Sequence, residues 1–250
     1  MRRLRTALSV LTVIPVGGKG PGAFPSPHDL PLSVPFFPLV GACLGLLLAL
    51  LNHFLSKVLP AQLTAVLLVT LAWMLTGGIH LDGLADTVDG LASRAPAARA
   101  LEVMHDPRVG AVGAAAAFLT ILIKYASLAV LLPGPRTVVL LVMPVVGRQA
   151  MVTVMPFYRY AREGPGLAAP FAGEVSPGHA ALALAVASLL LVVACLGYPR
   201  LGSPSWWGQG WAWGQAAWQQ TAWPGAWEDL LETCTEPCVN WPRPSSYWEW

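Results

Sequence analysis

Three aspartates stand close together in the sequence and carry its strongest chemical signal. Asp82, Asp86 and Asp89 follow one another at spacings of four and three residues. On a helix they would lie within about 60° of one another and would share one face. Like charges this close repel, so the stripe makes chemical sense if a cation binds there. Oxygen ligands without cysteine favour a hard ion such as Mg²⁺, which shares its other positions with water and substrate phosphates.

Glycine and histidine residues flank this acidic stripe. Gly83 and Gly90 each follow an aspartate, and without a Cβ they let a ligand or a neighbouring helix approach the backbone. His80 lies about 160° from Asp82 on an ideal helix, so it would turn toward the stripe only if the backbone unwinds at Gly77–Gly78. It could be a general base, a partner of a metal ligand or a polar packing residue. The plain alternative is that the aspartates form a solvated helix end.

Basic residues downstream of the stripe are candidates for binding phosphate. Arg94 follows shortly after it, and a guanidinium group binds phosphate through two parallel hydrogen bonds. Glu102 and Asp106 come next, and they either complete a metal site or pair with Arg99 and Arg108 at the surface. Carboxylates around a metal with arginines beside them favour phosphoryl or phosphodiester-type transfer.

The overall composition indicates a membrane protein. The chain has 250 residues, of which 11% are charged and 55% are apolar, and its formal net charge is +2. Soluble domains carry about 25% charged residues. A mean hydropathy of +0.58 agrees with this. These values exclude a disordered chain, an ordinary water-soluble enzyme and a basic domain that binds nucleic acid. Membrane lipid is the expected environment.

The apolar residues fall into five blocks, each close to the ~20 residues that a bilayer requires. The sequence therefore predicts an all-α, polytopic transmembrane helix bundle over residues 1–200. The five predicted spans are Val34–Leu51, Ala61–Ile79, Ala111–Leu132, Thr137–Met155 and Ala180–Gly197.

Two basic residues lie inside these spans. Lys124 is in the third span and Arg148 in the fourth. A charge at membrane depth is costly, so we expect both to face the bundle interior, although Arg148 near a span's end could instead reach the headgroups. With the amino terminus inside, nine basic residues fall on inside segments and four on outside segments. This bias predicts that residues 80–110 and 156–178 are cytoplasmic.

The two ends of the chain differ from the spans. The basic residues 1–5 followed by the apolar Ala7–Val16 predict a short interfacial helix rather than a cleaved signal peptide. Residues 201–250 form a tail that holds ten of the eleven tryptophans without helical periodicity. This tail is either interfacial or poorly ordered, or it reflects a shifted reading frame near residue 197. Cys234 and Cys238 lack a second cysteine pair and do not predict a zinc site.

Several motifs are shared with one known family. The central one runs from Gly77 to Gly90 and reads GGIHLDGLADTVDG. Supporting motifs are Leu11 to Val16, Pro38 to Gly41, Leu101 to Gly110, Lys124, Gly147-Arg148 and Pro156 to Arg162. Together they closely resemble the cobalamin synthase family, adenosylcobinamide-GDP ribazoletransferase, over about residues 5 to 175. The further apolar spans and late Gly-Asp motif that are usual in that family do not occur in residues 201–250.

The resemblance implies a multi-pass enzyme of the bacterial inner membrane with its active-site loops in the cytoplasm. Family members join adenosylcobinamide-GDP to α-ribazole or its 5′-phosphate with Mg²⁺ and release GMP, so the implied partners are small corrinoid and ribazole substrates. We predict that Asp82, Asp86 and Asp89 hold the metal. His80 and Arg94 complete the predicted catalytic set. The candidates for binding substrate phosphate are Arg94, Arg108, Lys124 and Arg148.

Other functions remain as alternatives. Asp86-x2-Asp89-Gly90-x2-Ser93-Arg94 is similar to the first half of the CDP-alcohol phosphotransferase motif, but the second half requires a glycine where this chain has Val103. A prenyltransferase would also use carboxylate-bound Mg²⁺. A transporter could bind its substrate at Lys124 and Arg148, although no internal repeat is visible.

Overall fold

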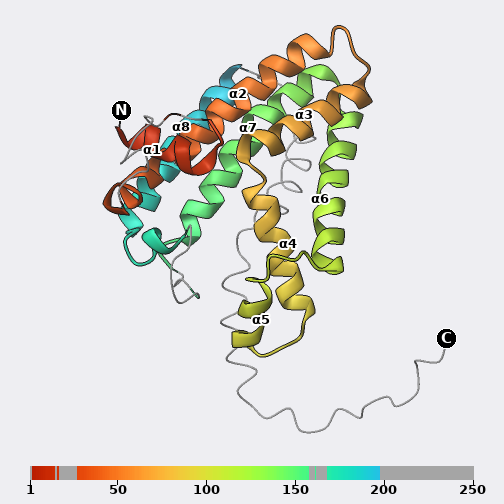
Figure 1. Ribbon diagram of the computed structural model, residues 1–250. Helices are drawn as coiled ribbons and strands as arrows, with labels where there is room; N and C mark the ends of the chain where they lie inside the picture. The colour runs from red at the N-terminus through yellow and green to blue at the C-terminus, as the bar shows by residue number, and fades with distance from the viewer. Residues whose placement is uncertain (1, 15, 17–26, 158–160, 162–167, 198–250) are drawn as a thin grey trace, which may run out of the picture.

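The structure is a computed structural model that describes residues 2–14, 16, 27–157, 161 and 168–197 (Figure 1). Every regular element in these ranges is helical, which confirms the predicted all-α class. The α-helices are α1 (Arg2–Leu11), α2 (Phe37–Leu55), α3 (Ala61–Thr76), α4 (Ile79–Ala92), α5 (Ala97–Val103), α6 (Ala111–Val130), α7 (Pro133–Val154) and α8 (Pro177–Gly197). Three short 3₁₀ helices join them: η1 (Pro27–Asp29), η2 (Pro31–Phe36) and η3 (Ala169–Phe171). The tryptophan-rich tail lies outside the described residues.

Four described helices are long and apolar enough to cross a membrane. They are α2 with its η2 extension (Pro31–Leu55), α6, α7 and the first 18 residues of α8. The bent pair α3 and α4 makes a fifth candidate, so the expectation of about five spans is confirmed. Within the predicted span Ala61–Ile79, however, α3 ends at Thr76, because Gly77 and Gly78 both adopt positive φ angles of 64° and 74°. Glycine enters this left-handed region without steric cost, and here two in succession break the helix.

Helices α2 and α7 pack against each other through glycine. A Cβ on Gly41 would lie 2.4 Å from the carbonyl oxygen of Pro144, and one on Gly45 would lie 2.7 Å from that of Leu141. Glycines four residues apart therefore let the two backbones approach closely, as small residues do in membrane helix pairs. Pro144 has no N–H of its own to donate along α7.

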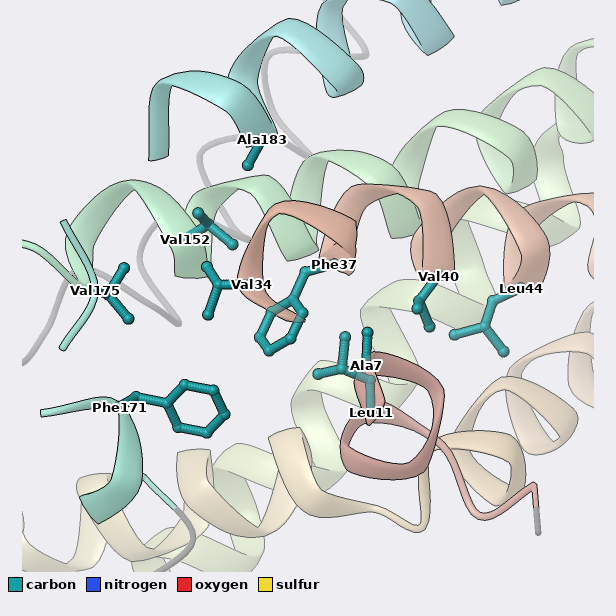
Figure 2. Packing of buried hydrophobic residues seen from close by; sticks show 10 residues of the cluster. All are labelled: Ala7, Leu11, Val34, Phe37, Val40, Leu44, Val152, Phe171, Val175 and Ala183. Atoms are coloured by element: carbon teal, nitrogen blue, oxygen red, sulfur yellow. The ribbon is translucent and has the colours of Figure 1, made fainter. Parts of the chain in front are cut away.

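The main apolar core joins α1, η2, α2, α7, η3 and α8. Figure 2 shows Phe37 at the start of α2 with the ring of Phe171 facing it, and the two rings meet edge to face with centroids 6.0 Å apart. Ala7 and Leu11 of α1 pack into the same cluster, so a short N-terminal helix is present, although it begins at Arg2 and ends at Leu11 and is docked on the bundle. Val152 of α7 closes the cluster from the other side.

A second core lies where α2, α3, α6 and α7 meet, and polar contacts fix its end. Its buried residues are Leu48, Ala65, Leu68, Leu128 and Leu140. Asn52 donates from Nδ2 to Thr137 Oγ1 at 2.8 Å, which ties the end of α2 to the start of α7. Arg136, which the sequence placed on an outside segment, is only 1% exposed and donates to the carbonyl oxygens of Leu128 and Leu131 at the end of α6.

The outward faces of α3, α6 and α8 are apolar. Large exposed side chains on them include Leu63, Val66, Phe118, Leu119, Ile123, Leu184, Leu189 and Val193. Only 11% of the apolar window of α6 is buried inside the molecule, and the same holds for α8. Such a surface fits a lipid environment, because water would disfavour so large an apolar area.

Candidate active site on helix α4

Helix α4 carries the acidic stripe and His80 on a separate arm. It bends away from α3 by 86° at Gly77–Gly78. The acidic stripe therefore lies on a helix of its own and not on the span that precedes it. Figure 1 shows α4 beside the half of α6 that is remote from α3 and α7, with α5 next to α4. The last turns of α4 contact the first turns of α6, so the two helices run antiparallel.

The three aspartates occupy one continuous helix, as their spacing predicted. Asp82 is exposed, whereas Asp86 and Asp89 are half-buried. Asp82 also lies in the first turn of α4, where a negative charge interacts favourably with the helix dipole. The helical arrangement keeps Asp82 and Asp86 one turn apart on the same face.

Asp89 has a role that its spacing alone did not reveal. Its Oδ2 accepts a hydrogen bond from the backbone N–H of Gly110, and its Oδ1 accepts one from that of Gly113, both at 2.8 Å. These groups belong to the first turn of α6, whose N–H groups have no partner within the helix. The contact is so close that a Cβ on Gly113 would lie 2.2 Å from Asp89 Oδ2 and 2.5 Å from the carbonyl oxygen of Ala85. Asp89 therefore caps α6 from another helix.

This geometry bears on the predicted Mg²⁺ site. Among the described residues, no three His, Cys, Asp or Glu side chains lie close enough together to hold a metal ion. A metal bound by Asp89 would compete with the N–H groups of Gly110 and Gly113. Mg²⁺ commonly uses only one or two carboxylates when substrate phosphates and water fill its other positions. The metal site therefore stays a prediction.

His80 lies inward at the start of α4, where the break at Gly77–Gly78 redirects the chain. Its Nε2 lies 3.2 Å from the Sδ of Met151 on α7. When Nε2 carries the proton, it donates to this weak acceptor and leaves Nδ1 as an acceptor. Nδ1 is buried and has no hydrogen-bond partner among the described residues. His80 thus joins α4 to α7 and presents one unused ring nitrogen.

Lys124 and Arg148 lie near His80, from two further helices. The positive charges of both act on the His80 imidazole, and the charge of Arg148 also acts on Lys124. Both side chains are half-buried, and the Nε of Arg148 is buried without a hydrogen-bond partner among the described residues. Both side chains are thus partly enclosed by the bundle, which agrees with the expectation for charges at membrane depth. We call His80, Lys124 and Arg148 the basic cluster.

Arg94 stands at the turn between α4 and α5. Its φ angle is +50°, and it is the only non-glycine residue with a positive φ in the described part of the chain. The left-handed conformation costs an ordinary residue roughly 1–2 kcal/mol. Strain of this kind gathers at functional sites, and the Arg94 side chain is exposed beyond the end of the acidic stripe.

The remaining charged residues of this region form surface pairs. Arg99 pairs with Glu102 on α5, and Arg108 donates to both carboxylate oxygens of Asp106. The side-chain hydrogen bond from Arg108, followed by its backbone hydrogen bond, lowers the pKa of Asp106 to about 2. The sequence left two roles open for Glu102 and Asp106, as metal ligands or in surface ion pairs. The structure shows surface ion pairs. Arg108 is exposed and already engaged there.

Comparison with known proteins places this arrangement in a family. The profile of the family described as cobalamin-5-phosphate synthase matches residues 3–222. This chain belongs to that family. The match reaches well beyond residue 175, where the resemblance of the motifs ended, and into the tryptophan-rich tail.

Individual members of the cobalamin-5-phosphate synthase family agree with the profile. An adenosylcobinamide-GDP ribazoletransferase of Syntrophobacter fumaroxidans is 40% identical over 77% of this chain and 78% of its own length. The protein of the same name from Geotalea daltonii is 39% identical over 81% of this chain and 79% of its own. One from Pseudomonas syringae pv. syringae is 40% identical over 74% and 76%. No solved structure matches the chain significantly.

Proposed function

We propose that this protein is an adenosylcobinamide-GDP ribazoletransferase that uses Mg²⁺ and acts from the cytoplasmic side of a bacterial inner membrane. The relatives that carry this name cover about four-fifths of the chain at about 40% identity, and this is the observation that carries the proposal. The apolar helices support a membrane location, and the excess of basic residues on one side supports the orientation. The products would be adenosylcobalamin or its 5′-phosphate, and GMP.

The proposed reaction breaks the phosphoanhydride bond of a diphosphate and forms a phosphoester bond. A hydroxyl oxygen of α-ribazole forms a bond to the phosphorus attached to cobinamide, and the bond from this phosphorus to the GMP oxygen breaks. The bonding pair leaves with GMP. The nucleophile belongs to the substrate, so the protein must orient two substrates, receive one proton and balance the charge of the diphosphate.

The residues around α4 suit these tasks. Asp82 and Asp86 would hold Mg²⁺ against the diphosphate, where the ion would neutralise charge on the leaving GMP. The Nδ1 of His80, which has no hydrogen-bond partner among the described residues, would accept a hydrogen bond from the attacking hydroxyl and then its proton. Arg94, at the open end of the stripe, would bind a phosphate oxygen of the nucleotide. Asp89 would act indirectly by fixing α4 against α6.

The test supplies adenosylcobinamide-GDP and α-ribazole to membranes that contain the protein. GMP and a cobalamin product should form with Mg²⁺ and cease when a chelator removes it. Asp82→Asn should abolish turnover while membrane insertion and thermal stability are retained, because Asp82 is exposed and makes no described hydrogen bond through its side chain. Glu102→Gln is the matched control, since Glu102 pairs with Arg99 on the surface, and it should keep full activity.

Two results would contradict the proposal in different ways. Full activity of Asp82→Asn would show that the acidic stripe does not bind the metal. Uptake of a solute into vesicles without any covalent product would instead favour a transporter.

A further inference from the structure

Val13, just beyond the end of α1, is hydrogen bonded to the end of α3. The carbonyl oxygens in the last turn of a helix have no partner within that helix. One of these in α3, that of Leu75, accepts a hydrogen bond of 2.9 Å from the backbone N–H of Val13. The Leu75 side chain also packs against the main core, to which α1 contributes. The N-terminal segment is therefore attached to α3 at the point where the chain turns into α4.

The side chain of Val13 reaches the corner between α3 and α4. A Cβ on Gly77 would lie 2.8 Å from Val13 Cγ1, so the valine occupies the space beside this glycine. Val13 is nevertheless 59% exposed, so burial of apolar area accounts for little of its placement. The motif Leu11 to Val16, which contains it, is shared with the family, and the proposed reaction gives this motif no task.

Hydrogen bonds fix the segment that contains this valine. Nε and Nη2 of Arg5 both donate to the carbonyl oxygen of Val16, at 3.0 and 2.8 Å. The hydroxyl of Thr12 donates to a carbonyl oxygen of α1 and accepts from the backbone N–H of Ile14. We call residues 12–14 the strap. The strap is thus tied to α1 on one side and to the end of α3 on the other.

The corner itself cannot set the direction of α4. Gly77 and Gly78 both have positive φ angles, and glycine moves between backbone conformations at little cost. The 86° bend must therefore be fixed by contacts from outside the corner. Asp89 holds the far end of α4 against α6, whereas the strap contacts the near end. His80 lies in the first turn after that near end.

We propose that Val13 is a positioning residue of the reaction, and that the strap sets the direction in which α4 leaves α3. This rests on the proposed function and deepens it, because the valine acts through α4 on His80 and contacts no substrate itself. The other contact at the near end, from His80 to the sulfur of Met151, uses a weak acceptor. A displacement of about 1 Å can slow a reaction about a hundredfold, so a loose corner would slow the chemical step.

The first arm of the test measures the corner directly and needs no turnover. Spin labels at Thr70→Cys on α3 and Ala92→Cys on α4, both exposed positions, report the distance between the two helices in a chain whose native cysteines are replaced. The unsubstituted strap should give one narrow distance distribution in nanodiscs. Val13→Ala should broaden or shift it, because the contact with the corner is lost. Val13→Ile, which keeps both γ carbons, should retain it.

Two arginines of α1 provide a matched comparison. Arg5→Gln releases the carbonyl oxygen of Val16, so it should loosen the strap and change the distribution as Val13→Ala does. Arg3→Gln removes the same charge from an exposed position that makes no hydrogen bond among the described residues, and it should leave the distribution narrow. Unchanged distributions in Val13→Ala and Arg5→Gln would overturn the proposal, even if both variants were less stable, because the strap would then serve folding alone.

The second arm links the corner to the reaction. With Mg²⁺, adenosylcobinamide-GDP and α-ribazole, Val13→Ala and Arg5→Gln should lower kcat at least about tenfold. The KM values for both substrates should stay within about twofold, because binding tolerates a shift that the reacting atoms do not. Val13→Ile and Arg3→Gln should keep the kcat of the unsubstituted protein. A raised KM with an unchanged kcat would place the strap in substrate binding and overturn the positioning role.

The two arms separate failure of this proposal from failure of the proposed function. If the unsubstituted protein forms no cobalamin product, the proposed function is wrong, and the distance distributions still decide whether the strap fixes the corner. If product forms and Val13→Ala has the kcat of the unsubstituted protein, the function stands and the positioning role is wrong.

Discussion

Asp89 Oδ1 accepts a hydrogen bond of 2.8 Å from the backbone N–H of Gly113, across the interface between α4 and α6. The other oxygen of the same carboxylate accepts one of equal length from Gly110. One side chain thus satisfies two N–H groups in the first turn of α6 and places a negative charge at the positive end of that helix. The arm that carries the acidic stripe is held on the bundle by this contact.

Replacing Asp89 should therefore affect folding as well as activity. Asp89→Asn removes the charge and leaves a single acceptor oxygen facing two N–H donors. We expect the free energy of unfolding to fall by about 1–3 kcal/mol, as for the loss of a hydrogen bond to a charged group. Thermal unfolding in detergent would measure this, with Asp82→Asn as the comparison that loses activity without losing stability. Equal stability of the two variants would contradict the capping role.

Gly113 should tolerate no side chain. A Cβ there would lie within 2.5 Å of both Asp89 and the backbone of Ala85, so Gly113→Ala must push α4 away from α6. We expect lower stability, although alanine in a helix is ordinarily more favourable than glycine by about 1 kcal/mol. Gly147→Ala on α7, where a Cβ would meet nothing within 4 Å, should be neutral or stabilising. Equal shifts in the unfolding temperatures of the two variants would contradict a close contact at Gly113.

Gly41 should be equally restrictive at the interface of α2 and α7. A Cβ on it would lie 2.4 Å from the Pro144 carbonyl oxygen, and the obstacle is backbone rather than a movable side chain. Gly41→Ala should lower the free energy of unfolding by about 1–3 kcal/mol, as overpacking does. Titration with a denaturing detergent would detect it. Gly134→Ala on α7 serves as the control, because a Cβ there would meet nothing within 4 Å. An equal loss of stability in that variant would exclude close packing as the cause.

Arg94 should show a conflict between stability and activity. At its φ of +50°, glycine is the favoured residue, so Arg94→Gly should raise the free energy of unfolding by about 1 kcal/mol. It should also lower kcat/KM with adenosylcobinamide-GDP, because the guanidinium is lost. Arg99→Gly, within the short helix α5, should act in the opposite way: slightly less stable and fully active. Wild-type kcat/KM for Arg94→Gly would show that the arginine has no part in binding the nucleotide.

The sequence predicted the elements that depend on local pattern. Span length and apolar composition located α2, α6, α7 and α8, and the four- and three-residue spacing placed the aspartates on one helix. It also named unwinding at Gly77–Gly78 as the condition under which His80 could turn inward, and the structure has a helix break there, with His80 next to Met151 of α7.

What the sequence did not predict depends on partners far along the chain. The N–H groups that occupy Asp89 lie 21 and 24 residues away, and nothing in the stripe marks one aspartate as different from the other two. Arg136 counted as an outside charge, yet it is buried against the end of α6, because its neighbours Leu128 and Leu131 offer unpaired carbonyl oxygens. Gly110 and Gly113 lie close to the start of a predicted helix. Their role as donors to Asp89 can be recognised only once α4 is seen beside α6.

Helix α3 has 16 residues and is therefore about 24 Å long, whereas the hydrocarbon layer of a bilayer is about 30 Å thick. A helix of this length that starts at one surface of the bilayer ends before it reaches the opposite surface. The bend at its end would then lie below the level of the headgroups. The charged substrates would react in a recess that opens to one aqueous side, and they would not cross the lipid.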